Sequence, residues 1–257
     1  MSDAPVLVSR EGAVGTITLN RPDKRNALDA ATVAAIGAAL AELDADGDIR
    51  VIALRGAGSD FCAGADLAQL ERIAAGADAI SNLDDAQALG DLFIRMRGAG
   101  KPIVALVHGN AIAGGAGLAG ACDIVLATHD AVFGYPEVHL GFVPAMVMAL
   151  LRRAVGEKVA FELVARGGRF SAADARRLGL VNQVYDADGF DDEARTYTQE
   201  LALRSASALT LTKRLLYGMD GMSFDQAIAR GAEINALARS TDDCRAGVRR
   251  FLDRTSR

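Results

Sequence analysis

Two glycine-rich turns are the first features of this sequence whose residue types could support chemistry. One is FCAGADL at residues 61–67, and the other is HGNAIAGGAGLAGACD at residues 108–123. Each follows a short apolar run that predicts a buried strand, and each leads into a helix-forming segment. Backbone N–H groups at the start of a helix lack intrahelical partners and carry the positive end of the helix dipole. Two such turns in one α/β body could therefore direct two hydrogen-bond donors at one developing oxyanion.

Glu137 is the best candidate for acid–base chemistry. It lies in FGYPEVHLGFVP at residues 133–144, where the apolar neighbours Phe133, Tyr135 and Val138 favour burial. Burial raises the pKa of a carboxyl group towards the working pH, which suits a group that must accept and release a proton. His139 would share the side of Glu137 only if this segment is extended. A structural role is the expectation for this histidine.

A dinucleotide site is the alternative reading of the second turn. Gly115, Gly117 and Gly120 fit G-x-G-x-x-G, with Glu137 as the ribose acid. Seven residues separate the predicted strand 103–107 from Gly115, whereas the dinucleotide fingerprint places its first glycine at the strand end. The spacing therefore argues against this alternative.

The elements that must position these residues can be read from apolar periodicity. Residues 6–8 and 14–19 predict an antiparallel hairpin, and Asp29 predicts the N-cap of a helix that extends to Leu43. Residues 51–54 and 103–107 predict buried strands, and the faint likeness of VIALRGAG to IVALVHGN suggests stacked ββα turns. Residues 73–85 have little periodicity and predict a mobile segment.

The last quarter of the chain has a different character. Helical patterns cover residues 191–203, 206–217, 224–238 and 244–252. We therefore expect two parts, an α/β body over residues 1–190 that carries the site and a helical region over residues 191–257.

Composition excludes several classes of protein. The 257 residues include 28 Lys and Arg against 33 Asp and Glu, a net charge of −5, which argues against nucleic acid or an anionic membrane as a partner. Cys62, Cys122 and Cys244 have no CxxC spacing, so we expect reduced, mostly buried thiols and no metal site. No signal peptide, transit peptide or membrane-spanning segment is readable, which predicts a cytoplasmic protein.

These motifs, in this order and spacing, resemble the enoyl-CoA hydratase/isomerase family, the crotonases. The resemblance extends from RPDKRNAL at Arg21, through the two turns and FGYPEVHLGFVP, to RFSAADARRLGLVNQV and the C-terminal helix. It implies an α/β fold, a crotonase-like spiral of repeated ββα turns with a C-terminal helical trimerisation region. It also implies acyl-CoA substrates, a homotrimer or a dimer of trimers, and no cofactor, since coenzyme A is part of the substrate.

The resemblance assigns catalytic roles to three residues. The backbone N–H groups of Ala65 and Gly114 would form the oxyanion hole that stabilises a thioester enolate, and Glu137 would transfer protons. The first glutamate of the two-acid hydratases falls on Gly117, which cannot transfer protons. A glutamate introduced there is expected to raise hydration relative to isomerisation if the pocket has room for it.

The resemblance also assigns contacts with the substrate. Lys24 and Arg25 would lie beside the nucleotide of coenzyme A, although solvated surface cations would look the same in the sequence. Arg254 would approach it from a neighbouring subunit. Asp66 would lie beside the adenine or cap the helix that begins there. The complete predicted set is Lys24, Arg25, Ala63, Asp66, Leu67, Phe251 and Arg254.

Three functions remain open at this point. The leading hypothesis is an enoyl-CoA hydratase of fatty acid metabolism. Gly117 keeps a Δ3,Δ2-enoyl-CoA isomerase with a single glutamate nearly as plausible, because a double-bond shift needs only one base. The third is an inactive acyl-CoA-binding protein.

Overall fold

The computed structural model describes residues 4–76 and 78–255, and within them six strands form the main sheet. Their order is β1-β2-β3-β4-β6-β9; β1 is antiparallel to β2 and the other neighbours are parallel. The strands are β1 (Val6–Glu11), β2 (Val14–Leu19), β3 (Val51–Gly56), β4 (Ile103–Val107), β6 (Ile124–Thr128) and β9 (Gln183–Tyr185). A smaller sheet contains β5 (Asn110–Ile112), β7 (Val132–Gly134) and β8 (Arg169–Ser171).

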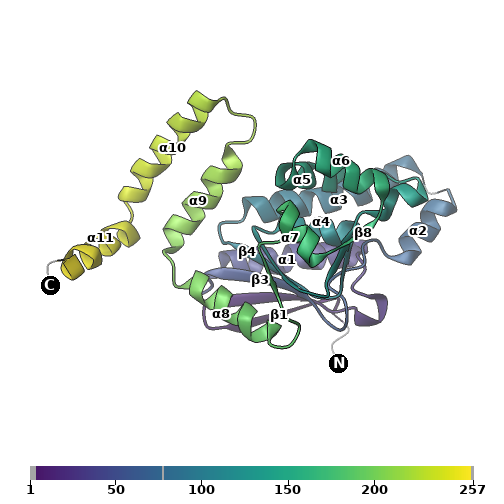
Figure 1. Ribbon diagram of the computed structural model, residues 1–257, viewed down its shortest axis with the longest axis horizontal. Coiled ribbons are helices and arrows are strands. Elements are labelled where there is room, and N and C mark those ends of the chain that lie inside the picture. The colour runs from purple at the N-terminus through teal and green to yellow at the C-terminus, as the bar shows by residue number, and fades with distance from the viewer. Residues whose placement is uncertain (1–3, 77, 256–257) are drawn as a thin grey trace.

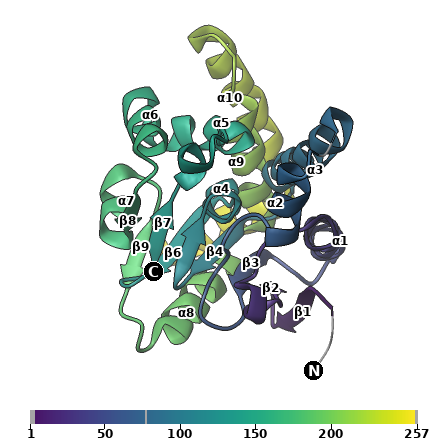
Figure 2. The same ribbon diagram turned by 90° about the vertical axis from the view of Figure 1, so that its right-hand side faces the viewer.

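Helices cover both faces of the main sheet. In the body they are α1 (Ala30–Ala45), α2 (Leu67–Ala74), α3 (Ala79–Gly98), α4 (Gly114–Ala121), α5 (Ala145–Val155), α6 (Glu157–Arg166), α7 (Ala172–Leu178) and α8 (Phe190–Ala202), with short 3-10 helices η1 (Pro22–Lys24) and η2 (Pro136–Leu140). Figure 2 shows α1 and α3 to α6 above the sheet and α8 below it. The sheet is therefore the middle layer of three.

The alternation of side chains along the strands explains these layers. In β3, Ile52 and Leu54 join the large core under α1 and α3, whereas Val51 and Ala53 face the smaller core that contains Phe190 of α8. Parallel strands buried on both faces have almost continuous apolar sequences, as these do. This confirms the predicted α/β class.

Most of the predicted elements are confirmed. The hairpin pairs β1 with β2, and the Asp29 carboxylate caps α1 by accepting a hydrogen bond of 2.8 Å from the Thr32 N–H. The prediction of a mobile segment over residues 73–85 is wrong at both ends, because Ile73 and Ala74 belong to α2 and α3 begins at Ala79, with Asp78 accepting hydrogen bonds from the N–H groups of Ile80 and Ser81. The segment is rich in Ala, Gly, Asp and Ser, so its periodicity did not reveal the capped start of this helix. Ala77 lies outside the described residues.

The helical arm comprises α9 (Ala206–Gly218), α10 (Phe224–Arg239) and α11 (Asp242–Thr255) and extends away from the body (Figure 1). Its first helix is attached through Lys213, whose ammonium donates to the Met96 and Lys101 carbonyls at 2.9 and 3.0 Å and pairs with Asp123 at 2.8 Å. Both members of the ion pair are largely buried. Helix α8 packs on the sheet, and only the helices after it project from the body. The predicted boundary between two parts of the chain at residue 190 stays a prediction.

Replacing Lys213 with methionine is expected to destabilise the protein by about 3 kcal/mol, because it leaves the buried Asp123 carboxylate without its cation. The measurement is urea denaturation. Arg195→Ala is the matched control, since Arg195 forms an exposed i,i+3 pair with Asp192 and such pairs contribute about 0–1 kcal/mol. Equal urea midpoints for the two variants would contradict the assigned role of Lys213.

Two further expectations can be compared with the structure. Cys62 and Cys122 are buried free thiols, and burial raises the pKa of Cys62 to about 12, which makes it unreactive. Across the described ranges, no helix combines the length and apolar character needed to span a membrane.

Candidate active site

The two glycine-rich turns lie against each other. Cys62 donates its N–H to the Asn110 carbonyl at 2.9 Å and accepts from the Ile112 N–H at 3.0 Å. Gly64 has a φ of +91°, and a Cβ on it would lie only 2.9 Å from the Ile112 carbonyl oxygen and 3.6 Å from the Gly114 nitrogen. Glycine is therefore required there for the turns to approach each other this closely.

The N–H groups of Ala65 and Gly114 have no hydrogen-bond acceptor among the described residues, and both residues line one cavity. Beside Ala65, a bridge to Leu28 uses the carbonyl of Gly64 at 2.7 Å and the N–H of Asp66 at 3.0 Å, and leaves the Ala65 N–H unused. Gly114 is the first residue of α4, where N–H groups lack intrahelical partners. The structure thus brings together the two predicted oxyanion donors.

Ala113, immediately before Gly114, holds an unusual backbone conformation with φ 52° and ψ −120°. Such conformations cost about 1–3 kcal/mol and persist only where the surroundings impose them. Here the Ala113 N–H is bound to the Gly134 carbonyl at 2.8 Å. The strained residue turns the chain from β5 into α4 and sets the direction of the Gly114 N–H.

The cavity that contains these donors has a volume of about 690 Å³. Its walls come from the loop before α1, from α2, α3 and η2, and from the start of α5, and they are mostly apolar. Apolar wall residues include Leu28, Val33, Leu70, Ile73, Leu89, Ile112, Leu140, Phe142, Val143, Met146 and Val147. A concave, largely apolar cavity with a few converging polar groups suits an acyl chain that ends in a polar reacting group.

Glu137 lies on η2 and lines the same cavity. Its Oε2 atom is buried and has no hydrogen-bond partner in the described structure. Burial raises the pKa of the Glu137 carboxyl above its ordinary value of 4.5. A carboxyl group with one unpaired oxygen and a raised pKa, in a cavity with two free donors, is suited to proton transfer.

His139 follows Glu137 on η2, which is helical, so the extended geometry that would have placed both on one side is not present. Its Nε2 lies 3.1 Å from the Gly167 carbonyl oxygen. A carbonyl only accepts, so Nε2 is the donor in this contact. This bond supports the structural role expected from the sequence, although His139 also lines the cavity.

Gly117 lies in the interior of α4 and not in a turn after a strand, so the dinucleotide fingerprint is not formed. A Cβ on Gly117 would lie 2.5 Å from Cγ2 of Val147 and 3.1 Å from Cζ of Phe93. Val147 lines the cavity. The space that a second carboxylate would need is therefore filled by apolar side chains, and the condition of free room is not met.

The residues predicted to contact coenzyme A divide into two groups. Near the cavity, Ala63 lines it, Lys24 is half-exposed 3.8 Å from Asp66, and Leu67 is exposed at the start of α2. Asp66 is buried and caps α2 by accepting from the Ala68 N–H at 2.9 Å. That hydrogen bond, to which the guanidinium of Arg21 adds, holds the pKa of Asp66 below its usual value.

The other predicted residues are placed differently. Arg25 follows η1 with φ 49°, and its carbonyl accepts from the Ala63 N–H at 3.0 Å. Phe251 and Arg254 lie exposed on α11, and neither lines the cavity of its own chain. Figure 1 shows α11 on the opposite side of the molecule from α2 and α3. One chain alone does not bring Phe251 and Arg254 to the site, whereas Arg25 is bonded to Ala63, which lines the cavity.

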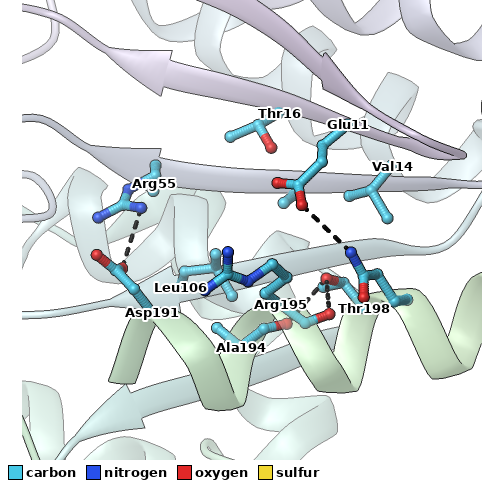
Figure 3. A pocket seen from close by; sticks show the side chains of 11 residues that line it. Glu11, Val14, Thr16, Arg55, Leu106, Asp191, Ala194, Arg195 and Thr198 are labelled. Carbon is cyan, nitrogen blue, oxygen red and sulfur yellow. Dashed lines mark hydrogen bonds and ion pairs between the residues drawn. The ribbon is translucent and has the colours of Figure 1, made fainter. Parts of the chain in front are cut away.

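A second cavity, of about 320 Å³, lies between the sheet and α8 (Figure 3). Its polar side chains bind one another. Arg55 pairs with Asp191 at 3.1 Å, and the Gln199 amide donates to the Glu11 carboxylate at 3.3 Å. Across the described part of the chain, no group of three or more His, Cys, Asp or Glu is arranged to hold a metal ion.

Sequence reasoning missed Val147 and Phe93, which fill the space at Gly117, and Arg21, which lies under the rim of the cavity. Val147 lies in an apolar helix start with no feature to distinguish it. Arg21 opens RPDKRNAL, but nothing in the sequence pattern indicates that its side chain is buried.

Comparison with known proteins agrees with this geometry. The family model described as enoyl-CoA hydratase/isomerase matches residues 9–257. A Thermus thermophilus protein, provisionally named enoyl-CoA hydratase, is 41% identical over 95% of this chain and 96% of its own length. The 2,3-dehydroadipyl-CoA hydratase of Escherichia coli is 32% identical over 97% of this chain and 96% of its own.

Solved structures show the same fold. An enoyl-CoA hydratase from Mycobacterium smegmatis superposes with a TM-score of 0.92 at 32% identity, over 97% of this chain and 96% of its own. The match of the family model to nearly the whole chain and the relative at 41% identity establish the relationship. This chain belongs to the enoyl-CoA hydratase/isomerase family.

Proposed function

We propose that this protein hydrates 2-enoyl-CoA thioesters. The observation that carries the proposal is the buried, unpaired Oε2 of Glu137 in the same apolar cavity as the free N–H groups of Ala65 and Gly114. The two N–H groups bind the thioester oxygen and stabilise the enolate that forms when water adds to Cβ. The relatives described above carry hydratase names, which supports the same reaction.

A single carboxyl group can move both protons. The Glu137 carboxylate accepts a proton from the attacking water while the water oxygen forms its bond to Cβ. The protonated carboxyl then returns that proton to Cα on the same face, so H and OH both come from one water molecule. The raised pKa suits this exchange, because it makes the carboxylate a better base.

The packing at Gly117 favours one alternative, a Δ3,Δ2-enoyl-CoA isomerase. Val147 and Phe93 keep a second carboxylate out of the site. A base that removes a proton from one carbon and returns it to another needs no bound water. An inactive acyl-CoA-binding protein is the remaining possibility from the sequence.

Product analysis with crotonyl-CoA and a 3-enoyl-CoA, run side by side, distinguishes these functions. A hydratase forms 3-hydroxybutyryl-CoA from crotonyl-CoA. An isomerase leaves crotonyl-CoA unchanged and converts the 3-enoyl-CoA into the 2-enoyl-CoA. Binding of both thioesters without turnover would leave only the binding protein.

Placing a second carboxylate at position 117 tests the packing argument. Gly117→Glu alone is expected to lose about 1–3 kcal/mol of stability by overpacking against Val147 and to gain little hydration. The double variant with Val147→Ala has room for the side chain and should gain hydration relative to isomerisation. Thermal unfolding and the product ratio are the measurements.

Gly117→Ala and Val147→Ala alone are the controls, because they change packing without adding a carboxyl group. A Gly117→Glu variant with the same melting temperature as the unaltered protein would contradict the expected overpacking. A folded double variant with an unchanged product ratio would show that position 117 does not address the reacting carbons.

Assembly into trimers belongs to the same proposal. The helical arm exposes a series of large apolar side chains: Leu216, Phe224, Ile228, Leu237, Val248, Phe251 and Leu252. Exposed apolar surface of this extent usually marks an interface. A trimer or dimer of trimers would cover it and could bring Arg254 of one subunit to the coenzyme A bound by another, beside Lys24 and Arg25. Sedimentation showing a stable monomer at micromolar concentration would refute the assembly.

A further inference from the structure

Arg21 connects the two loops that form the rim of the cavity. Its Nη1 donates to the Ala27 carbonyl at 2.7 Å and lies 3.1 Å from the Asp29 carboxylate, and its Nη2 donates to the Asp66 carboxylate at 2.7 Å. The Arg21 side chain is 14% exposed and that of Asp66 is 7% exposed. A planar guanidinium can hold several acceptors in fixed directions, which a lysine ammonium cannot do.

The acceptors of Arg21 immediately flank the backbone bridge at the oxyanion hole. Ala27 and Asp29 lie on either side of Leu28, and Asp66 follows Ala65. Leu28 in turn binds both neighbours of Ala65, donating to the Gly64 carbonyl at 2.7 Å and accepting from the Asp66 N–H at 3.0 Å. The guanidinium therefore fixes the relative position of the two strands of this bridge, and the direction of the Ala65 N–H follows from it.

Asn26 stabilises the same two loops through further hydrogen bonds. It is completely buried, accepts from the Arg21 N–H at 2.9 Å, and donates to the Ala57 and Asp60 carbonyls at 2.9 and 2.7 Å. These bonds hold the loop that leads into the first glycine-rich turn. The loop that Arg21 contacts is therefore also held by the hydrogen bonds of Asn26.

We propose that Arg21 is a positioning residue that aims the Ala65 N–H at the thioester oxygen. It does not line the cavity and acts through Leu28 and Asp66. This inference rests on the proposed oxyanion hole and not on whether the product is a hydroxyacyl-CoA or a shifted double bond. Loss of Arg21 should therefore weaken stabilisation of the enolate much more than binding of the ground state.

The first test uses the infrared spectrum of bound butyryl-CoA labelled with ¹³C at the thioester carbonyl. This saturated thioester cannot be hydrated, so the spectrum reports the hydrogen bonds to the carbonyl even if the hydratase assignment fails. In Arg21→Met the carbonyl stretch is expected to move to higher frequency, because one donor is misdirected. Arg21→Lys, which restores the charge without the planar geometry, should recover only part of the shift.

The second test is kinetic. Arg21→Met is expected to lower kcat by roughly 10-fold to 100-fold, as for the misplacement or partial loss of one oxyanion donor, while the dissociation constant of butyryl-CoA stays within about threefold. Arg10→Met is the matched control. Arg10 also pairs with two carboxylates, those of Glu42 and Asp46, but it lies on β1 and outside the residues that line the cavity.

Asp66→Asn keeps the experiment decisive if Arg21→Met does not fold. Asparagine caps a helix about as well as aspartate, so α2 stays capped while the ion pair with Arg21 is lost. It should reproduce the infrared shift and the fall in kcat. A folded Arg21→Met or Asp66→Asn protein with the unaltered carbonyl frequency and kcat would overturn the proposal.

Discussion

Replacing Glu137 with glutamine is expected to lower turnover by roughly 10²-fold to 10⁴-fold and to leave acyl-CoA affinity nearly unchanged. The amide keeps the shape of the side chain in the cavity but cannot accept and return a proton. Steady-state kinetics give kcat, and titration with butyryl-CoA gives the dissociation constant. An unchanged kcat in the folded variant would remove Glu137 from the mechanism, and His139 would then be the next residue to replace.

The same substitution should stabilise the protein at neutral pH. Burial raises the pKa of Glu137 in the folded state above 4.5, because it penalises the ionised carboxylate. Stability from this group is complete below the unfolded pKa and is lost as the pH rises through the folded pKa. Above that range the folded protein holds an ionised Oε2 without a partner, and glutamine avoids this cost.

Thermal unfolding from pH 4 to pH 8 measures this effect. The melting temperature of Glu137→Gln should exceed that of the unaltered protein at pH 8, and the difference should shrink as the pH falls towards 4. A difference that is independent of pH would mean that the folded and unfolded states bind the same number of protons at this site. Lower activity with higher stability is the expected behaviour of a catalytic group held in an unfavourable environment.

The sequence was sufficient to predict the elements with a clear periodicity or a capping residue. The helix capped by Asp29, the hairpin and the four C-terminal helices all begin within two residues of their predicted starts. The two glycine-rich turns were recognisable as possible sources of backbone donors, because such a turn between a strand and a helix limits where the N–H groups can point. The choice of Ala65, Gly114 and Glu137 came from the family resemblance, and the structure places all three at one cavity.

The remaining features depend on contacts between segments distant in the sequence. Whether a glutamate could fit at Gly117 depends on Val147 and Phe93, which are 30 residues after it and 24 residues before it. The burial of Arg21 depends on Asp66, 45 residues away. No pattern in a single sequence indicates such pairs. The filled space at Gly117 and the burial of Arg21 are therefore visible only in the folded structure.

The oxyanion hole itself can be tested at Gly114 with two substitutions that differ in one N–H group. Gly114 is the first residue of α4, a position that tolerates proline because its N–H has no intrahelical acceptor. In folded Gly114→Pro protein we expect kcat to fall by roughly 10²-fold to 10³-fold, the usual cost of removing one oxyanion donor. Because Ala113, with φ 52° and ψ −120°, lies outside the extended region that a residue before proline prefers, folding of this variant is the first measurement. Gly114→Ala keeps the N–H, and its Cβ would have ordinary contacts, the nearest with Leu28 at 3.6 Å, so its kcat should stay within a few fold.

Melting temperatures, kcat and the carbonyl stretch of bound butyryl-CoA should be measured for both. Equal kcat values for the two folded variants would mean that the Gly114 N–H does not contact the thioester oxygen, and stabilisation of the enolate would then depend on the Ala65 N–H alone.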